Sequence, residues 1–308
     1  MIVSAPAAPG ASIVPEESAT ATIASTVAAV PSGASRAILG VDFTSAPRPA
    51  KPITIARGTL FDARLRIDAI DTARSFAEFE QVLMQPGPWT GGFDLPFGLP
   101  RVLLEKLCWP HTPADGCSGW ARMVRHLDAM PRAQMVAAFR AWCDARPAGQ
   151  KFAHRATDLR AGSSPSMKWV NPPVAFMLQA GAPRLLAAGV TVPGMQGGDP
   201  LRVALEAYPG MLARAFVGRN SYKSDSREGR SPGREAARVA IVEALERGEA
   251  LGVTVEFSPG LRAACIDDPR ADLLDAVLCA VQAAWAQGRP GYGLPADIDP
   301  VEGWIVGC

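Results

Sequence analysis

The first part of the chain carries short runs of apolar or alternating residues, a pattern typical of β-strands. Three such runs follow one another: "AILGVDF" (37–43), "PITIARGTL" (52–60) and "ARLRIDAI" (63–70). Their β-branched residues and their alternation of apolar and polar positions predict strands. We predict that Gly58-Thr59, near the end of the second run, separates the second strand from the third. The expected arrangement is an antiparallel meander.

Helical spacing appears next. Apolar residues within 73–84 recur three and four positions apart, which predicts a helix, and "WTGGFD" (89–94) predicts a short strand. The segment from 101 to about 195 is mostly helical in pattern, with loops rich in Pro, Gly and Ser. We interpret it as a helical insertion, not as an independent domain. Its expected helices cover 101–108, 119–130, 132–145 and 172–180.

The second half alternates strand and helix patterns. A strand is expected at 201–207, and the clearest helix at 269–286, with Asp268 as its N-cap and Pro269 at its first position. Residues 301–308 could add a last short strand. Further helices are expected at 211–217 and at about 233–248. Strands followed by alternating helices and strands predict one α/β domain with a mixed sheet over residues 36–308.

Composition narrows the classes of protein. Residues 1–35 contain no Lys or Arg and few large apolar residues, so we expect a disordered tail rich in Ala, Ser and Pro. The net charge of +1 gives no overall attraction to nucleic acid or membranes. No apolar run reaches the roughly 18–20 residues of a membrane helix. Six scattered cysteines in 308 residues suggest reduced thiols and a cytoplasmic protein.

Four acidic residues occupy positions where the apolar pattern predicts burial: Asp42, Asp94, Glu206 and Asp275. A single buried carboxylate is ordinarily explained by a salt bridge or a backbone cap. Four carboxylates that converge repel one another unless a cation lies between them. Ligands that are all oxygen favour Mg²⁺ or Mn²⁺. Asp272 shares the helix face of Asp275, but an acid in a first helical turn is also favoured by the helix dipole.

Several motifs resemble, in the same order, a bacterial family of unknown function that is predicted to contain ribonuclease-H-like nucleases. The resemblance covers roughly residues 37–306. The motifs are "GVDFTSAP", "GGFDLPFGLP", "HRATD", "SSPSMKWVNPP", "ALEAYPG", "SYKSD", "DLLDAVLCA" and "EGWI". This resemblance implies a ribonuclease-H-like mixed sheet flanked by helices, with the first three strands antiparallel. It also implies acids on the first strand, a later strand and the final helix, which correspond to Asp42, to Asp94 or Glu206, and to Asp275.

Basic residues between 210 and 240 suggest a phosphate-contacting arm, although a solvated loop of ordinary surface charge has the same composition. Within it, Lys223 matches the family's "SYK", and Tyr222 is suited to stack on a base. Arg155 and Lys168 are further candidates for substrate contacts.

The leading hypothesis is a metal-dependent nuclease in which the four acids bind one or two Mg²⁺ or Mn²⁺ ions and nucleic acid is the substrate. Two such ions about 3.5–4 Å apart clamp the attacking and leaving oxygens of a phosphodiester. One alternative is an actin-like or sugar-kinase-like ATP-binding phosphotransferase, in which Thr44 and Ser45 would contact phosphate. The other is a nucleic-acid-binding module without catalysis. Sequence alone does not distinguish DNA from RNA.

Overall fold

The computed structural model describes Met1 and residues 35–224, 226, 229–249 and 251–308. The tail expected over residues 1–35 therefore lies almost entirely outside the described residues. From Ser35 onward the described residues belong to one compact unit.

Seven strands of this unit form a single mixed sheet in the order β5-β6-β4-β1-β2-β3-β7. β1 pairs antiparallel with β2, and β2 antiparallel with β3, which confirms the expected meander. The pairs β1–β4, β4–β6, β5–β6 and β3–β7 are parallel. The strand bounds are β1 Arg36–Asp42, β2 Ile53–Phe61, β3 Arg64–Ala73, β4 Trp89–Asp94, β5 Val190–Thr191, β6 Asp199–Glu206 and β7 Thr254–Phe257.

The turn of the meander lies later than predicted. β2 continues through Gly58 to Phe61, and the chain reverses at Asp62, whose φ is 51°. At Gly58 the pairing register with β3 shifts by one residue, as in a β-bulge. A Cβ at this position would lie 2.7 Å from the carbonyl oxygen of Arg66, so the close approach of the two backbones requires glycine.

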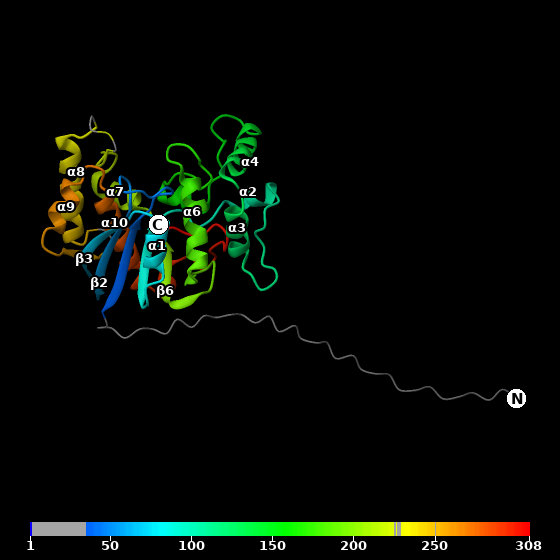
Figure 1. Cartoon of the computed structure of the whole chain (residues 1–308), viewed down its shortest axis with the longest axis horizontal. Helices are drawn as coiled ribbons and strands as arrows, with labels where there is room; N and C mark the ends of the chain where they lie inside the picture. Colours follow the sequence, from blue (N-terminus) through cyan, green and yellow to red (C-terminus); the bar gives the residue numbers. More distant parts are fainter. Residues whose placement is uncertain (2–34, 225, 227–228, 250) are drawn as a thin grey trace. The chain divides into compact units, whose positions relative to one another are not determined.

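The helices expected between β4 and β5 are present, so this segment is helical as predicted (Figure 1). The longest of them, α6, begins close to the predicted position but extends seven residues further, to Ala187. Four of these helices and strands had no prediction: α5, β5, β7 and α9. The helix bounds are α1 Phe76–Leu83, α2 Arg101–Lys106, α3 Gly119–Asp128, α4 Arg132–Asp144, α5 Ala156–Ala161, α6 Val174–Ala187, α7 Pro209–Val217, α8 Pro232–Glu246, α9 Leu261–Asp267 and α10 Asp272–Gln287.

Helix α10 begins three residues later than predicted. Ala271, directly before it, has a φ of 60°, so the backbone is not helical there. Asp268 nevertheless acts near the helix start, since its carboxylate accepts hydrogen bonds from the N–H groups of Arg270 and Leu273 at 3.1 and 3.2 Å. The last strand expected within 301–308 is reduced to one bridge between Ile305 and Glu206.

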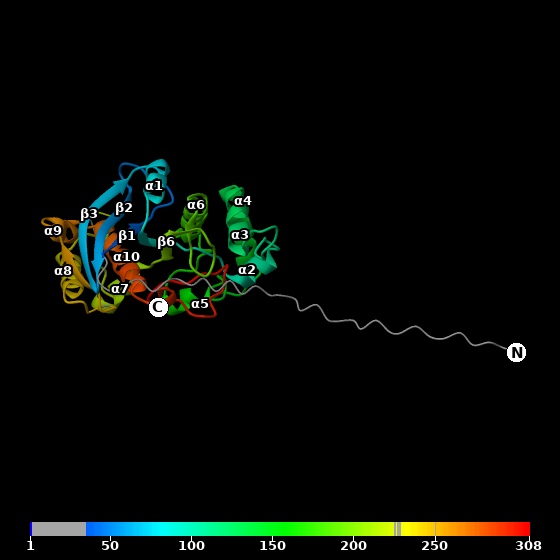
Figure 2. The ribbon, with the colours of Figure 1, turned by 90° about the horizontal axis from the view of Figure 1, so that it is seen from below.

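The two faces of the sheet are covered by different helices. Figures 1 and 2 show α8, α9 and α10 gathered beside β2 and β3, away from the helices between β4 and β5. Along β1, Leu39 and Val41 pack into the cluster that contains the helices of the insertion. Ile38 belongs to the cluster that contains α10. Alternate residues of β1 therefore face opposite layers, as the strand period requires.

Two glycines allow α10 to approach the sheet closely. A Cβ at Gly40 of β1 would lie 2.0 Å from the carbonyl oxygen of Ala276, and one at Gly92 of β4 would lie 2.3 Å from that of Cys279. Any larger residue at either position would push the helix away. The even-numbered positions of both strands thus face α10, and the close contact holds the start of α10 near the ends of β1 and β4.

Candidate functional site

Asp42 and Asp94 are the last residues of two neighbouring parallel strands, and they pair directly in register. Residues paired across parallel strands project to the same face of the sheet. Because Gly40 and Gly92 face α10, the residues two positions later, Asp42 and Asp94, face it as well. Both side chains are only partly buried. The sequence-based expectation that these two acids lie together is met.

Asp275 joins them from the helix. It lies in the first turn of α10, directly before Ala276, which touches the backbone at Gly40. Its side chain is buried, and both of its oxygens have partners. The Tyr222 hydroxyl donates a hydrogen bond to Oδ1 at 2.6 Å, and the Lys223 ammonium contacts Oδ2.

The charges of these groups influence one another. Burial raises the pKa of Asp42 well above its ordinary value, and the negative charges of Asp275 and Asp94 raise it further. Burial also raises the pKa of Asp94 to about 7, although the positive charge of Lys223 opposes this shift. Both effects are typical of carboxylates that share a site. The three acids therefore form one electrostatic unit, which we call the acidic cluster (Asp42, Asp94 and Asp275).

Lys223 lies at the surface of the acidic cluster. Burial alone would lower its pKa, but the Asp275 carboxylate more than compensates and raises it, so Lys223 is a cation at neutral pH. Its side chain is still 47% exposed. The backbone on either side is anchored: Arg238 donates to the carbonyl of Tyr222 at 2.9 Å, and the N–H of Ser224 donates to the carbonyl of Pro269 at 2.9 Å. Residues 222–224 thus form a loop, as the sequence predicts, and hydrogen bonds of its backbone hold this loop to the core.

Glu206, the fourth predicted acid, faces the other way. It pairs in register with Phe93, whose side chain packs in the core cluster of the insertion, so Glu206 projects to that face. Its carboxylate accepts two hydrogen bonds from Arg155, at 2.6 and 2.8 Å, and one from the N–H of Phe97 at 2.9 Å. Burial raises the pKa of Glu206, and Arg155 counteracts this. Glu206 is thus separated by the sheet from the acidic cluster.

Arg155, a predicted substrate contact, is the centre of a buried ion network. It is 1% exposed, and besides Glu206 it donates to Asp158 at 2.8 and 3.1 Å and to the carbonyl of Glu302 at 2.8 Å. All of its donors thus point to protein groups. The i, i+3 spacing of Arg155 and Asp158 in "HRATD" was a hint of this pairing that sequence reasoning did not use.

Lys168 lies in a turn that its own N–H closes with Pro165 at 2.9 Å. Its carbonyl accepts the N–H of Ala175 at 2.8 Å, which places Lys168 at the beginning of α6. Among the described residues, no hydrogen bond or ion pair joins Lys168 to the acidic cluster.

The basic residues of the loop that follows Asp42 were not among the substrate contacts predicted from the sequence. Arg132 of α4 donates to the carbonyl of Ser45, and Arg270 donates to that of Ala50, both at 2.9 Å. Arg48 lies between these anchors and Lys51 directly follows the second one; the two residues form a backbone bridge with each other, and both are exposed. The two cations therefore stand at the same edge of the sheet as the acidic cluster. The run "RPAK" could have indicated them.

Comparison with protein families gives one match. A family model described as "Protein of unknown function (DUF429)" covers residues 40–299. The chain belongs to the DUF429 family. No curated protein and no solved structure matches the chain in the corresponding searches. The matched range of this DUF429 chain includes the whole acidic cluster, Lys223 and the loop with Arg48 and Lys51.

The donor set of this DUF429 chain suits a hard cation, because every ligating atom of the acidic cluster is a carboxylate oxygen. Within the described ranges of the chain, no three or more His, Cys, Asp or Glu side chains are grouped so as to hold a metal ion. Asp275 already pairs with Tyr222 and Lys223, so Asp42 and Asp94 are the two carboxylates of the acidic cluster without such partners. Two carboxylates are sufficient for Mg²⁺, which commonly uses one or two together with water and substrate phosphate.

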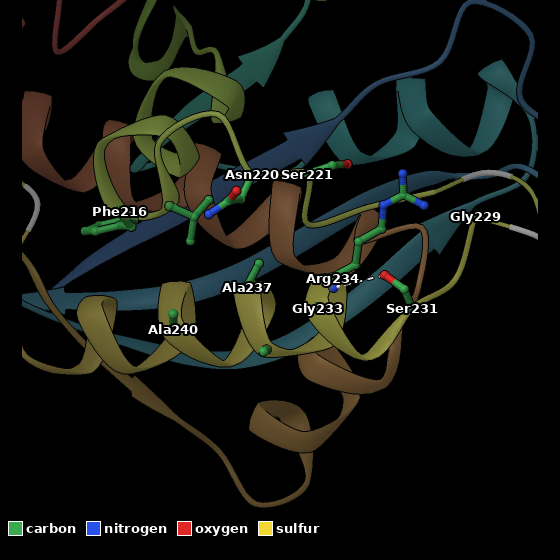
Figure 3. A pocket seen from close by; sticks show the side chains of 11 residues that line it. Phe216, Asn220, Ser221, Gly229, Ser231, Gly233, Arg234, Ala237 and Ala240 are labelled. Carbon is green, nitrogen blue, oxygen red and sulfur yellow. Dashed lines mark hydrogen bonds between the residues drawn. The ribbon is translucent and has the colours of Figure 1, made fainter.

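A pocket of about 950 Å³ is lined by the end of α7, the loop after it and the beginning of α8. Figure 3 shows Phe216 and Ala240 on its walls, with Asn220, Ser221 and Arg234 at its polar side. Ser221 directly precedes Tyr222 and Lys223. None of the three acids lines this pocket.

The described helices of the DUF429 chain include none that is both long and apolar enough to span a membrane.

Proposed function

We propose that this chain is a metal-dependent nuclease with a ribonuclease-H-like fold that hydrolyses phosphodiester bonds of nucleic acid. One observation carries the proposal: β1, β4 and α10 bring Asp42, Asp94 and Asp275 to one edge and one face of the sheet. Asp42 and Asp94 are partly exposed and have raised pKa values, and acids of this kind are functional-site candidates on physical grounds.

The topology supports the fold part of the proposal. The strands β3, β2, β1, β4 and β6 are consecutive neighbours in the sheet, and the first three strands of the chain are antiparallel. The acids lie on the first strand, on the fourth and on the last α-helix, which is the distribution that the resemblance to ribonuclease-H-like nucleases implies. Glu206 is not part of this proposal, because it faces the opposite side.

In this proposal the acids bind the metal ion and the basic side chains contact the substrate. Asp42 and Asp94, paired and partly exposed, would hold Mg²⁺ or Mn²⁺ with carboxylate oxygens. When bound, such an ion lowers the pKa of water and stabilises charge on the phosphate oxygens. Lys223 would limit the repulsion between the acids and a phosphate. Arg48 and Lys51 would contact phosphates of the same strand away from the reacting bond.

The nucleic-acid part of the proposal depends on these local cations. A net charge of +1 provides no long-range attraction, so a polyanion needs basic side chains beside the acids. Arg48, Lys51 and Lys223 meet this need at the same edge of the sheet. All six cysteines have free thiols, which supports a cytoplasmic location for the enzyme.

The test compares the purified full chain with its Asp42→Asn variant on labelled single- and double-stranded DNA and RNA, with Mg²⁺, Mn²⁺ or EDTA. We expect metal-dependent cleavage by the wild type and at least a hundredfold slower cleavage by the variant, with an unchanged circular dichroism spectrum. Asp62→Asn is the matched control, because this exposed acid lies in the β2–β3 turn with a φ of 51°, which asparagine also adopts.

Two results would replace the proposal by another function. Stabilisation of the wild type by ATP without cleavage of any substrate favours the ATP-binding phosphotransferase. Nucleic-acid binding with no divalent-ion binding in calorimetry favours the non-catalytic module. A third result, metal-dependent cleavage that persists in Asp42→Asn protein, contradicts the assigned site.

A further inference from the structure

Asp275 is the most deeply buried member of the acidic cluster, and its carboxylate has no free oxygen. Tyr222 donates to one oxygen at 2.6 Å and Lys223 contacts the other. Its side chain is only 2% exposed. A cation that approached from solvent would have to displace one of these partners before it could bind Asp275.

Asp42 and Asp94 differ from Asp275 in this respect. Both are partly exposed, they stand side by side at the ends of paired strands, and neither has a side-chain hydrogen bond among the described residues. These two carboxylates are therefore open to a ligand from solvent.

The position of Lys223 is set by the fold. The carbonyl of the preceding residue, Tyr222, accepts from Arg238, a side chain that is 5% exposed and also donates to the carbonyl of Ile266 at 2.6 Å. The following residue, Ser224, is pinned to Pro269 at 2.9 Å. Both backbone neighbours of Lys223 are thus held by hydrogen bonds, one to α8 and one to the segment that leads from α9 into α10, so its ammonium is a built-in part of the cluster.

We infer that Lys223 takes the place of a second metal ion, so that the acidic cluster binds one divalent cation, through Asp42 and Asp94. This inference rests on the proposed function, since it specifies how many ions that site takes. One ammonium and one divalent cation together neutralise three carboxylates. A second divalent ion would bring an excess of positive charge and would require Asp275 to release Lys223 or Tyr222.

The charge of Lys223 also reaches beyond Asp275. It opposes the pKa shifts of both Asp42 and Asp94. Its direct acidic contact among the described residues is Asp275, and its ammonium lies 5.5 Å from the centroid of the Tyr222 ring.

The experiment is a count of bound ions, with no dependence on catalysis. Titration of the metal-free full chain with Mn²⁺, followed by isothermal calorimetry and by electron paramagnetic resonance of free Mn²⁺, is expected to give one ion per wild-type chain. Lys223→Gln removes the ammonium and frees Oδ2 of Asp275, so a second Mn²⁺ is expected to bind through this oxygen. Lys223→Arg keeps the charge and is expected to return the count to one. Lys106→Gln, an exposed lysine at the end of α2, is the matched control.

The outcomes separate the inference from the proposed function. Two ions on the wild type would overturn the inference and leave the nuclease proposal standing. One ion on wild type and on Lys223→Gln alike would also overturn it. No binding to the wild type would contradict the proposed function itself. If Lys223→Gln does not fold, Asp275→Asn decides: one ion with unchanged affinity supports the inference, and loss of binding overturns it, because Asp275 would then be a ligand.

Discussion

Replacement of Arg155 by alanine tests whether this residue is a buried structural cation or a substrate contact. The guanidinium is 1% exposed and donates to two buried carboxylates, those of Glu206 and Asp158. Arg155→Ala would leave both carboxylates buried without their cation. Loss of one partner of a buried ion pair costs about 3–5 kcal/mol of folding free energy. Two acids are left here, so we expect a loss at the upper end of this range.

The double variant shows whether the loss comes from unpaired charge. Adding Glu206→Gln to Arg155→Ala removes one of the two stranded charges, and the amide oxygen of the new side chain can still accept the hydrogen bond from Phe97. The double variant is therefore expected to be more stable than Arg155→Ala alone by about 1–3 kcal/mol, a coupling typical of residues in contact. Urea unfolding followed by tryptophan fluorescence and circular dichroism measures each variant. Arg140→Ala, an exposed arginine on α4, is the control and is expected to change stability by less than about 0.5 kcal/mol.

One result would refute the reasoning directly. If Arg155→Ala unfolded at the same urea concentration as the wild type but bound nucleic acid much more weakly, Arg155 would be a substrate contact, as the sequence first suggested. Arg155→Lys provides a folded variant if alanine abolishes folding. It retains one charge but not the paired hydrogen bonds, so an intermediate stability is expected.

Two further predictions concern the open edge of the sheet. Burial raises the pKa of Asp94 to about 7, so between about pH 4 and 7 the folded state keeps a proton on Asp94 that the unfolded state releases. The contribution of this protonated carboxyl to the folding free energy is present below about pH 4 and is lost as pH rises through about 7. Three pKa units would correspond to about 4 kcal/mol, and solvent screening of a partly exposed group reduces this to about 1–2 kcal/mol. Melting temperatures in EDTA from pH 5 to pH 8 should therefore fall less for Asp94→Asn than for wild type; parallel curves would contradict the assignment. The double variant Arg48→Ser, Lys51→Ser should reduce the slope of log affinity for nucleic acid against log salt concentration by about 1 for each lost phosphate contact. The control Arg64→Ser, at the opposite end of β3, should leave this slope unchanged. Equal slopes for all variants would exclude phosphate contacts at the loop after Asp42.

The strands around the acidic cluster were predictable because their pattern is long and regular. β1 to β4 each carry six or more residues of continuous or alternating apolar character, and Asp42 and Asp94 end two of them. The order of the sheet then brings the two ends together. By contrast, β5 has two residues and β7 has four, which is too short for a period to appear in the sequence. The contacts of Arg132 and Arg270 with the loop after Asp42 join residues far apart in the chain, and no local pattern encodes them.

The face of the sheet on which Glu206 lies could not be predicted from the sequence. The apolar run before it predicts a strand over 201–207, and the structure has β6 at Asp199–Glu206. Which face the acid occupies depends on register, and a shift of one residue moves a side chain across the sheet. The neighbour of Glu206 in β4 is Phe93, and the residue level with Asp94 is the following one, Ala207. The alanine methyl lies near Gly92, on the α10 face. The pairing register of β4 and β6 therefore decides that Glu206 lies on the face opposite α10.

The sheet therefore separates two acidic groups that differ in how far a basic side chain compensates their negative charge. On one face Arg155 is enclosed by Glu206 and Asp158, the group is buried, and its arginine is held by hydrogen bonds to both acids. On the other face three carboxylates share one lysine and part of the group is open to solvent. The first group is complete without any ligand, so its role is to hold α5 against β6. The second retains uncompensated negative charge at the surface, and the negative charge of Glu206 adds to it, since it contributes to the raised pKa of Asp94. A cation from solvent would relieve the repulsion only in the second group, which is why we assign the chemistry to the acidic cluster.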